Sequence, residues 1–204
     1  MKKLLLMAAV AVFGLSNVNA QDEKTTGGFT KGDVYVSGTV GYNNTKFGDI
    51  KTDQLTFAPT AGFFITENIS LEATLLVGSG EATIDLDGDS VGVDNSTFGG
   101  GLGATYFFTP ASQFSFIVGA GVSYTNSKIE FNAGDSAELK TNTFVVAVAP
   151  GLNYFVSACF ALRASVGALS YTSAKLDVDG AESINSFGLN LNLSDVNFGV
   201  TYKF

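Results

Sequence analysis

The charges of greatest chemical interest are Glu72, Arg163 and Lys203, because each interrupts a stretch of otherwise uncharged residues. A carboxylate and a guanidinium that approach each other form an ion pair with strong hydrogen bonds. Such a pair can gate a narrow pore or select its ions. It can also order a packed interior, where an isolated charge would be costly. The sequence leaves both uses open, and the elements that carry the three residues decide whether they can meet.

The chain has few of the residue types that catalyse other reactions. Its 204 residues include no His and a single Cys. The missing His removes the most common general base and metal ligand. One Cys excludes an internal disulfide or a cysteine metal cluster. We therefore expect no enzyme activity, no cofactor and no metal centre. A formal net charge of −8 also argues against nucleic acid as a partner.

The densest group of carboxylates lies in residues 79–96, which carry five acidic residues and no basic one. Asp85, Asp87 and Asp89 stand at alternate positions, and oxygen ligands spaced in this way can converge on Ca²⁺. The stretch lacks the glycine and glutamate positions of an EF-hand loop. A solvated hairpin turning at Asp87-Gly88 accounts for the same residues. We favour the hairpin, and calcium binding stays an open alternative.

The N-terminus predicts an export signal. Residues 1–20 contain the basic pair Lys2 and Lys3, an apolar stretch over 4–15 and a small-residue end at Ala20, after which we expect cleavage. The apolar stretch is shorter than the ~20 residues that a membrane helix needs. Residues 21–31 are polar and contain glycine, so we expect a flexible lead-in. One domain should follow over residues 32–204.

That domain alternates apolar with small or polar residues at a period of two, which predicts β-strands. The predicted strands cover 34–42, 55–63, 69–77, 98–108, 114–124, 144–154, 160–171 and 187–204. In the strand over 160–171 we expect one apolar face, made by Leu162, Ala164, Val166 and Ala168. A phase change at Ser194-Asp195 indicates a β-bulge in the last strand.

The connections alternate strictly between two lengths. Residues 65–68, 109–112 and 155–159 are short, whereas 43–53, 79–96, 125–142 and 172–186 are long and polar. Three of the long connections contain turn signals at mid-length: Asp87-Gly88, Ala133-Gly134-Asp135 and Asp179-Gly180. Short turns at one end and long loops at the other are typical of a transmembrane β-barrel.

Aromatic residues fit the same interpretation. Three successive strands carry pairs on the apolar face: Phe98 with Phe108, Phe114 with Tyr124, and Phe144 with Tyr154. Each pair is separated by ten positions. Ten residues tilted by ~40° rise ~25 Å along a barrel axis, which is the height between the aromatic girdles of outer-membrane barrels.

The chain length sets the number of strands. About 23 residues are available for each of eight strands with its connection, more than the ~9–11 that a spanning strand needs. The sheet must close, because lipid offers no partners to backbone groups. A weak repeat relates residues 57–64, 102–107 and 148–155. We expect a bulge or a lost ladder bond at Pro59 and Pro150, because proline has no N–H to donate.

The chain resembles the small outer-membrane β-barrel proteins of Gram-negative bacteria, in particular the porin-family barrel domain common in the Bacteroidetes and, more distantly, OmpX-like barrels. The matching elements are the ends of the strands over 55–63 and 144–154, the turn Thr66-Glu67-Asn68, and the terminal residues 198–204. The resemblance implies that Phe198, Val200, Tyr202 and Phe204 form a C-terminal signal for the barrel-assembly machinery. It implies no particular activity.

The fold class expected is therefore all-β: a closed, eight-stranded, antiparallel transmembrane barrel with short periplasmic turns and longer extracellular hairpins. In a barrel of this size the strands that carry Glu72 and Arg163 face each other across the lumen. We expect a non-enzymatic structural or surface-interaction protein with a largely filled lumen; a narrow porin-like channel is the alternative. The expected partners are outer-membrane lipid and lipopolysaccharide, the assembly machinery, periplasmic chaperones, and an extracellular partner of unknown identity.

Overall fold

The computed structural model of this chain describes residues 27–47, 50–86, 89–132, 137–190 and 196–204. The predicted signal peptide over residues 1–20 lies outside these ranges. Within them, no helix combines the length and the apolar character needed to cross a bilayer.

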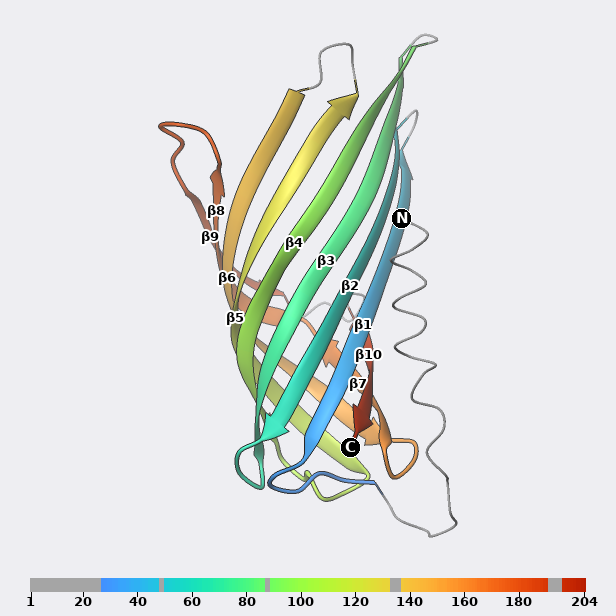
Figure 1. The fold of residues 1–204 in the computed structure, drawn as a ribbon, viewed down its shortest axis with the longest axis vertical. Helices are drawn as coiled ribbons and strands as arrows, with labels where there is room; N and C mark the ends of the chain where they lie inside the picture. The colour runs from blue at the N-terminus through green and yellow to red at the C-terminus, as the bar shows by residue number, and fades with distance from the viewer. Residues whose placement is uncertain (1–26, 48–49, 87–88, 133–136, 191–195) are drawn as a thin grey trace.

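The described residues form antiparallel β-strands joined into one sheet (Figure 1). Their bounds are β1 (Val34–Phe47), β2 (Ile50–Phe64), β3 (Ile69–Leu86), β4 (Asp89–Phe107), β5 (Phe114–Asn132), β6 (Ala137–Phe155), β7 (Phe160–Val166), β8 (Ala168–Leu176), β9 (Ile184–Asn190) and β10 (Val196–Lys203). β7 and β8 are the two halves of the seventh predicted strand, and β9 and β10 those of the eighth. The ring β1-β2-β3-β4-β5-β6-β7-β10 closes where β10 pairs with β1, which confirms the eight-stranded barrel.

We call the two ends of the barrel the short-turn end and the hairpin end. The short-turn end holds residues 65–68, 108–113 and 156–159. At the hairpin end the predicted long loops are instead mostly strand. Phe47 pairs with Ile50, and Leu86 pairs with Asp89. The sequence prediction ended these strands too early, because neighbours already in register keep exchanging backbone hydrogen bonds where the outward face turns polar.

The wall has a kink between β7 and β8 that the sequence analysis missed. Gly167 has a φ of 63°, a left-handed conformation that glycine adopts without strain. Gly151 pairs with Ser165 on one side of the kink, and Val148 pairs with Leu169 on the other, so the β7–β8 chain has one residue more than β6. This bulge reverses the alternation. The apolar outward residue after the kink is therefore Leu169, which corrects the prediction for Ala168.

Both prolines lie where the ladder is interrupted, as predicted. Pro150 pairs with Val118 of β5. On its other side it faces the bulge at Gly167 and has no paired residue. Pro59 pairs with Gly38 of β1, and the β2–β3 ladder is interrupted at Pro59 and its neighbour Ala58. The alternation also changes phase between β9 and β10, as predicted, although Ser194 and Asp195 themselves lie outside the described residues.

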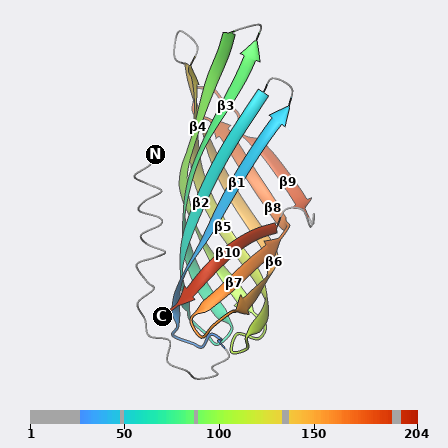
Figure 2. The ribbon, with the colours of Figure 1, turned by 90° about the vertical axis from the view of Figure 1, so that its right-hand side faces the viewer.

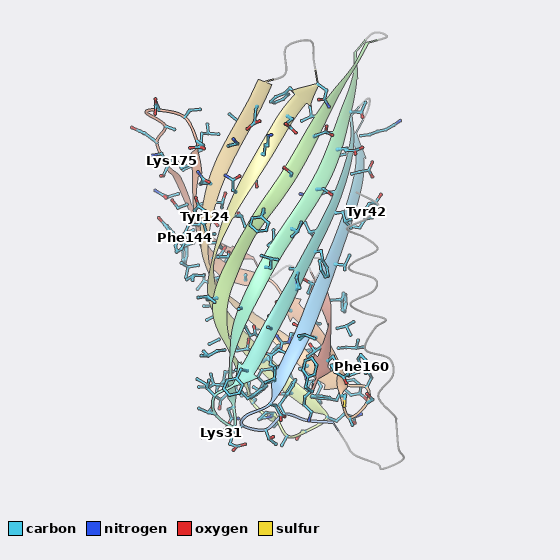
Figure 3. All side chains as sticks on the ribbon, viewed as in Figure 1. Lys31, Tyr42, Tyr124, Phe144, Phe160 and Lys175 are labelled. Atoms are coloured by element: carbon cyan, nitrogen blue, oxygen red, sulfur yellow. The ribbon has the colours of Figure 1, made fainter. Side chains whose placement is uncertain are left out.

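The outward face carries the predicted aromatic bands (Figure 3). Tyr124 pairs with Phe144 at one level, and Phe114 pairs with Tyr154 near the short-turn end. All four side chains are exposed, as is Tyr42 on β1, which lies at the level of Tyr124 in Figure 3. β5 and β6 continue well beyond the Tyr124–Phe144 pair toward the hairpin end. The apolar band therefore covers only part of the wall.

The wall is not uniformly closed along its height. β10 pairs with β1 from Tyr35 to Thr39 only. Beyond that point β9 pairs with β8, and among the described residues β9 has no ladder to β1. Figure 2 shows β10 beside only the lower part of β1, and Figure 1 shows the β8–β9 hairpin leaning away from β1. The kink at Gly167 explains this direction, because a bulge bends the strand that contains it.

Candidate functional site: the lumen ion pair and the aromatic floor

Glu72 and Arg163 meet inside the barrel. Arg163 Nη1 donates a hydrogen bond to Glu72 Oε1 at 2.7 Å, and each side chain is only 16% exposed. Glu72 comes from β3 and Arg163 from β7, which lie four strands apart in the ring. Both residues occupy the inward alternation, because Ser70 and Ala161, two positions away on the same strands, are fully buried. The narrow lumen therefore brings the two charges together.

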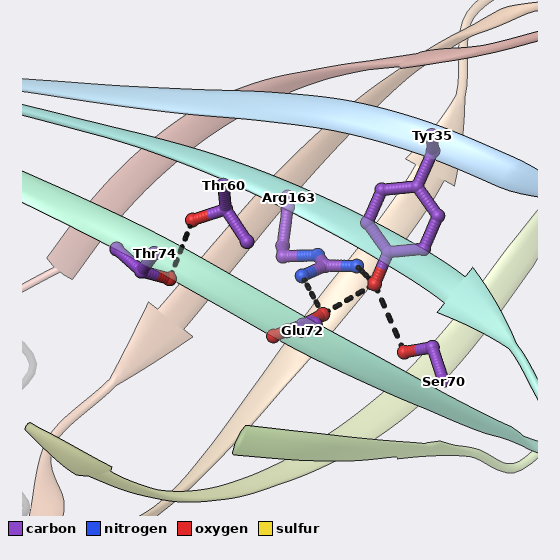
Figure 4. Close-up of polar contacts among 6 residues, drawn as sticks. All are labelled: Tyr35, Thr60, Ser70, Glu72, Thr74 and Arg163. Carbon is purple, nitrogen blue, oxygen red and sulfur yellow. Dashed lines mark hydrogen bonds and ion pairs between the residues drawn. The ribbon is translucent and has the colours of Figure 1, made fainter. Parts of the chain in front are cut away.

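Tyr35 of β1 completes this cluster (Figure 4). Its hydroxyl donates a hydrogen bond to Glu72 Oε1, accepts one from Arg163 Nη2 at 3.3 Å and lies 2.9 Å from Ser70 Oγ. The Tyr35 ring covers Gly62 on the neighbouring strand β2, and a Cβ atom at Gly62 would overlap the ring. Glycine at this position therefore allows a bulky inward side chain in a small barrel.

Aromatic rings form the surroundings of the guanidinium. Arg163 Cζ lies 5.3 Å from the centroid of the Tyr35 ring and 5.4 Å from that of Phe107. These distances permit cation–π attraction. The charge of Arg163 is thus balanced by one carboxylate and held between two rings. This arrangement leaves Arg163 little freedom to rearrange around a passing ion.

Below the ion pair, at the short-turn end, four phenylalanine rings pack against one another inside the barrel. Phe29 stacks on Phe64 with centroids 4.6 Å apart, and it contacts Phe107 and Phe155 edge-on at 5.4 and 4.9 Å. All four rings are buried. We call this group the aromatic floor. Phe64, Phe107 and Phe155 are the last residues of β2, β4 and β6, and their side chains face inward. Phe29 comes from the segment that precedes β1.

That segment, residues 27–33, crosses the short-turn end, and we call it the N-terminal strap. Phe29 N–H donates to the carbonyl of Pro110 at 2.7 Å. Lys203 Nζ donates to the carbonyl of Gly28 at 2.6 Å and lies 3.6 Å from Asp33 Oδ2. Gly28 lies so close to Ala111 that a Cβ atom would overlap the Ala111 backbone. The described part of the expected flexible lead-in, residues 27–31, is therefore packed against the barrel.

The three lumen charges singled out in the sequence divide into two groups. Glu72 and Arg163 form the ion pair, whereas Lys203 binds the N-terminal strap. Tyr35, Ser70 and Phe29 were missed. A signal for Tyr35 was present, because a large aromatic residue on the inward alternation departs from the small residues there. Phe29 had no such signal, because the strap shows no periodicity.

Three of the predicted C-terminal signal residues lie on the outward face of β10, and Phe204 directly follows that strand. Phe198, Val200 and Phe204 are exposed. The Tyr202 ring packs edge-on against Phe160 and Phe204, with centroids 5.0 and 5.1 Å apart. The strand is paired on both sides, with β1 and with β7. These contacts place the C-terminus at the seam that closes the barrel.

Metal-binding arrangements do not occur in the part of the chain that the structure describes: no group of three or more Asp, Glu or Cys side chains could hold an ion there. The described part of the predicted acidic loop is a hairpin ladder in which Asp85 stands opposite Ser90. Asp87 and Gly88 lie outside the described residues. In the last hairpin, Gly180 has a φ of 78°, which agrees with the predicted turn at Asp179-Gly180.

A closed ring of antiparallel strands with an apolar outward band, aromatic bands and polar side chains in its lumen defines a transmembrane barrel of the outer-membrane type. The chain belongs to the outer membrane protein beta-barrel domain family, whose model matches residues 6–204. It is a protein of the Gram-negative outer membrane.

Solved structures with the same fold include the outer membrane protein OprG from Pseudomonas aeruginosa, at 17% identity and a TM-score of 0.53. That alignment covers 87% of this chain and 98% of OprG. Neisserial surface protein A aligns over 84% of this chain and 97% of its own, with 17% identity and a TM-score of 0.47. No curated protein matches this chain in sequence.

Proposed function

We propose that this protein is a non-enzymatic outer-membrane barrel whose periplasmic end is sealed and whose role is structural or surface-interacting. The observation that carries the proposal is the aromatic floor beneath the Glu72–Arg163 pair. Phe29 is 1% exposed, and its ring contacts rings from β2, β4 and β6. A hydrated ion that enters from outside would have to displace this floor and break an ion pair to reach the periplasm.

The outward faces support contact with lipid and with the cell exterior. The aromatic bands suit the two interfaces of a bilayer, and the outer band would meet lipopolysaccharide. The hairpins β3–β4 and β5–β6 extend beyond the outer band, which makes them the natural contact for an extracellular partner. The terminal strand β10 offers Phe198, Val200, Tyr202 and Phe204 to the assembly machinery, with chaperones acting before insertion.

A narrow channel is the second candidate, and the lining of the lumen above the ion pair favours it. The inward positions of β4 and β5 there are small: Gly99, Gly101, Gly103, Gly119 and Gly121. Small side chains leave room for water. Movement of the N-terminal strap would then be the event that opens the channel.

Conductance in planar bilayers separates the two candidates. We expect the wild-type protein to stay at background, because the aromatic floor closes the lumen. Phe29→Ala removes the central ring, and it should raise a small conductance if the floor is the seal. Phe116→Ala removes an exposed phenylalanine from the outward face and is the matched control. Discrete channels in the wild type would refute the sealed barrel and favour the channel.

A further inference from the structure

The hairpin end has an inverted distribution of polar and apolar residues. Within the apolar band the outward face is apolar, as in the Tyr124–Phe144 pair. Beyond that band the outward face becomes charged. Lys128 Nζ lies 2.7 Å from Glu130 and also 2.7 Å from Glu138, and Glu138 lies 2.7 Å from Lys140.

The inward face of the same strands becomes apolar at that height. Val93 of β4 pairs with Phe131 of β5, and Ile129 pairs with Leu139 of β6. These four residues form the inner apolar patch. Their inward direction follows from the unbroken register of β4, β5 and β6 down to Phe107, Ile117 and Phe155, which are buried in the lumen. None of the four is buried, and Phe131 is 38% exposed.

Apolar side chains that face an open, water-filled mouth are unfavourable unless something covers them. The described strands of the two adjoining hairpins stay paired up to Leu86–Asp89 and Phe131–Ala137, so they do not fold back over the patch. The β8–β9 hairpin leans away from the other strands (Figure 1). Among the described residues, no segment is positioned over the patch. The patch consists of four side chains only, which suits a small molecule.

One polar atom within the patch specifies the chemistry further. Asn95 pairs with Ile129, next to Val93, and its side-chain oxygen is buried without a hydrogen-bond partner. A buried acceptor without a donor is costly. Asn95 stands opposite Ile129 and two positions from Val93, so a donor held against the patch comes next to this oxygen. Binding sites for small ligands commonly combine apolar walls with one or a few polar groups of this kind.

We propose that the inner apolar patch, with Asn95, binds a small, uncharged, mainly apolar molecule that carries one hydrogen-bond donor, such as a phenol or an indole. The rings of the ligand would cover Ile129, Phe131 and Leu139. Its hydrogen-bond donor would donate to the side-chain oxygen of Asn95. Charged molecules are disfavoured, because the inward residues next to the patch, Asn95, Ser127 and Thr141, carry no charge. This site lies at the extracellular mouth and does not depend on whether the periplasmic end is sealed.

The test uses the full barrel in lipid nanodiscs, with 2-naphthol as the probe and empty nanodiscs as the background. The chain contains no Trp, so the fluorescence of the probe is read without interference from indole. We expect saturable binding above the background. 2-Methoxynaphthalene, which has the same rings and no donor, should bind more weakly. No saturable binding of 2-naphthol by the wild type would overturn the proposal.

Matched variants locate the probe. Ile129→Ser with Leu139→Ser removes the apolar side chains of one cross-strand pair, and the affinity should fall at least about tenfold because burial of two aliphatic side chains is lost. Lys128→Ser with Lys140→Ser changes the adjacent positions on the outward face and should leave the affinity within about twofold. Equal losses in the two double variants would show that the probe does not bind at the inner face.

Two further measurements distinguish the loss of a ligand contact from misfolding of a variant. Asn95→Leu should abolish the preference for 2-naphthol over 2-methoxynaphthalene while binding of the rings persists; an unchanged preference would remove Asn95 from the site. On the wild-type protein, nuclear Overhauser effects should connect the naphthol ring protons with the methyl groups of Ile129 and Leu139. Contacts only with outward side chains would place the probe in lipid and overturn the proposal.

Discussion

Replacing Arg163 by Ala tests the lumen cluster most directly. The change leaves Glu72 without its counter-charge in an interior where both side chains are 16% exposed. Breaking a buried ion pair from one side costs about 3–5 kcal/mol. Arg163 also gives up cation–π contacts with Tyr35 and Phe107, at 5.3 and 5.4 Å. Uptake of a proton by Glu72 would reduce the loss, because a neutral carboxyl group is cheaper to bury.

Removing both charges together should do less harm. Glu72→Gln with Arg163→Met keeps most of the volume and leaves no uncompensated charge. The expected change in the free energy of unfolding is within about 2 kcal/mol of the wild type, because an uncharged replacement of similar size often matches a buried ion pair. The double variant should therefore be more stable than Arg163→Ala, although it carries one more substitution.

The temperature at which the folded band shifts in SDS gels gives a first ranking of the variants, and urea unfolding in micelles gives the free energies. Lys175→Met is the control, because it removes an exposed cation of β8 outside the lumen cluster and should leave the unfolding midpoint unchanged. Additive losses in the Glu72 and Arg163 single variants and in their combination would refute the coupling. Conductance of the double variant should stay at background if the pair only orders the lumen and rise slightly if it acts as a gate.

Four further predictions follow from the fold. Unboiled and boiled samples should migrate differently in SDS gels, because a closed barrel resists the detergent; identical migration of membrane-extracted protein would contradict closure. Phe204→Ser should lower the amount of assembled barrel without affecting export across the inner membrane, and normal outer-membrane levels would exclude a role for Phe204 in assembly. Gly167→Ala should destabilise the barrel by about 1–2 kcal/mol because of its positive φ, whereas Gly188→Ala, at a site with open space, should not; equal urea midpoints would contradict the bulge. The hydrogen bond from Lys128 lowers the pKa of Glu138, so its stabilisation is present at neutral pH and is lost as the pH falls through that lowered pKa. The protection factors of the β5–β6 amides near Glu138, which compare each exchange rate with the intrinsic rate at the same pH, should fall in acid, and a pH-independent protection pattern would argue against the ion pairs.

Much of the barrel could be predicted because its physical rules act on single positions. Lipid requires an apolar outward residue at every second position, so the alternation defined strands and faces directly. Strand number and inward direction then placed Glu72 and Arg163 on opposite walls. Whether the two side chains touch depends on how far the strands are staggered, which single positions do not determine. Tyr35 is a third member of the cluster, and its position depends on the pairing of β1 with β2.

The features that were missed have no such local rule. Outside the membrane the outward face turns polar, so strands there resembled loops. The kink at Gly167 was hidden because Ala168 is small enough to fit either face. The weak repeat did carry information that its prolines obscured. The blocks over 57–64, 102–107 and 148–155 end in Phe64, Phe107 and Phe155, the three strand-borne rings of the aromatic floor.

The N-terminal strap has a consequence for the order in which the barrel folds. Its binding site does not exist in any single hairpin, because Phe29 needs rings from β2, β4 and β6, and Gly28 needs Lys203 from the terminal strand. Lys203 in turn reaches its place only when β10 pairs with β1. The strap can therefore dock only after the first and last strands have met. Phe29, which precedes the first strand, thus docks only once the last strand has been inserted, and its docking makes the closed seam harder to reopen.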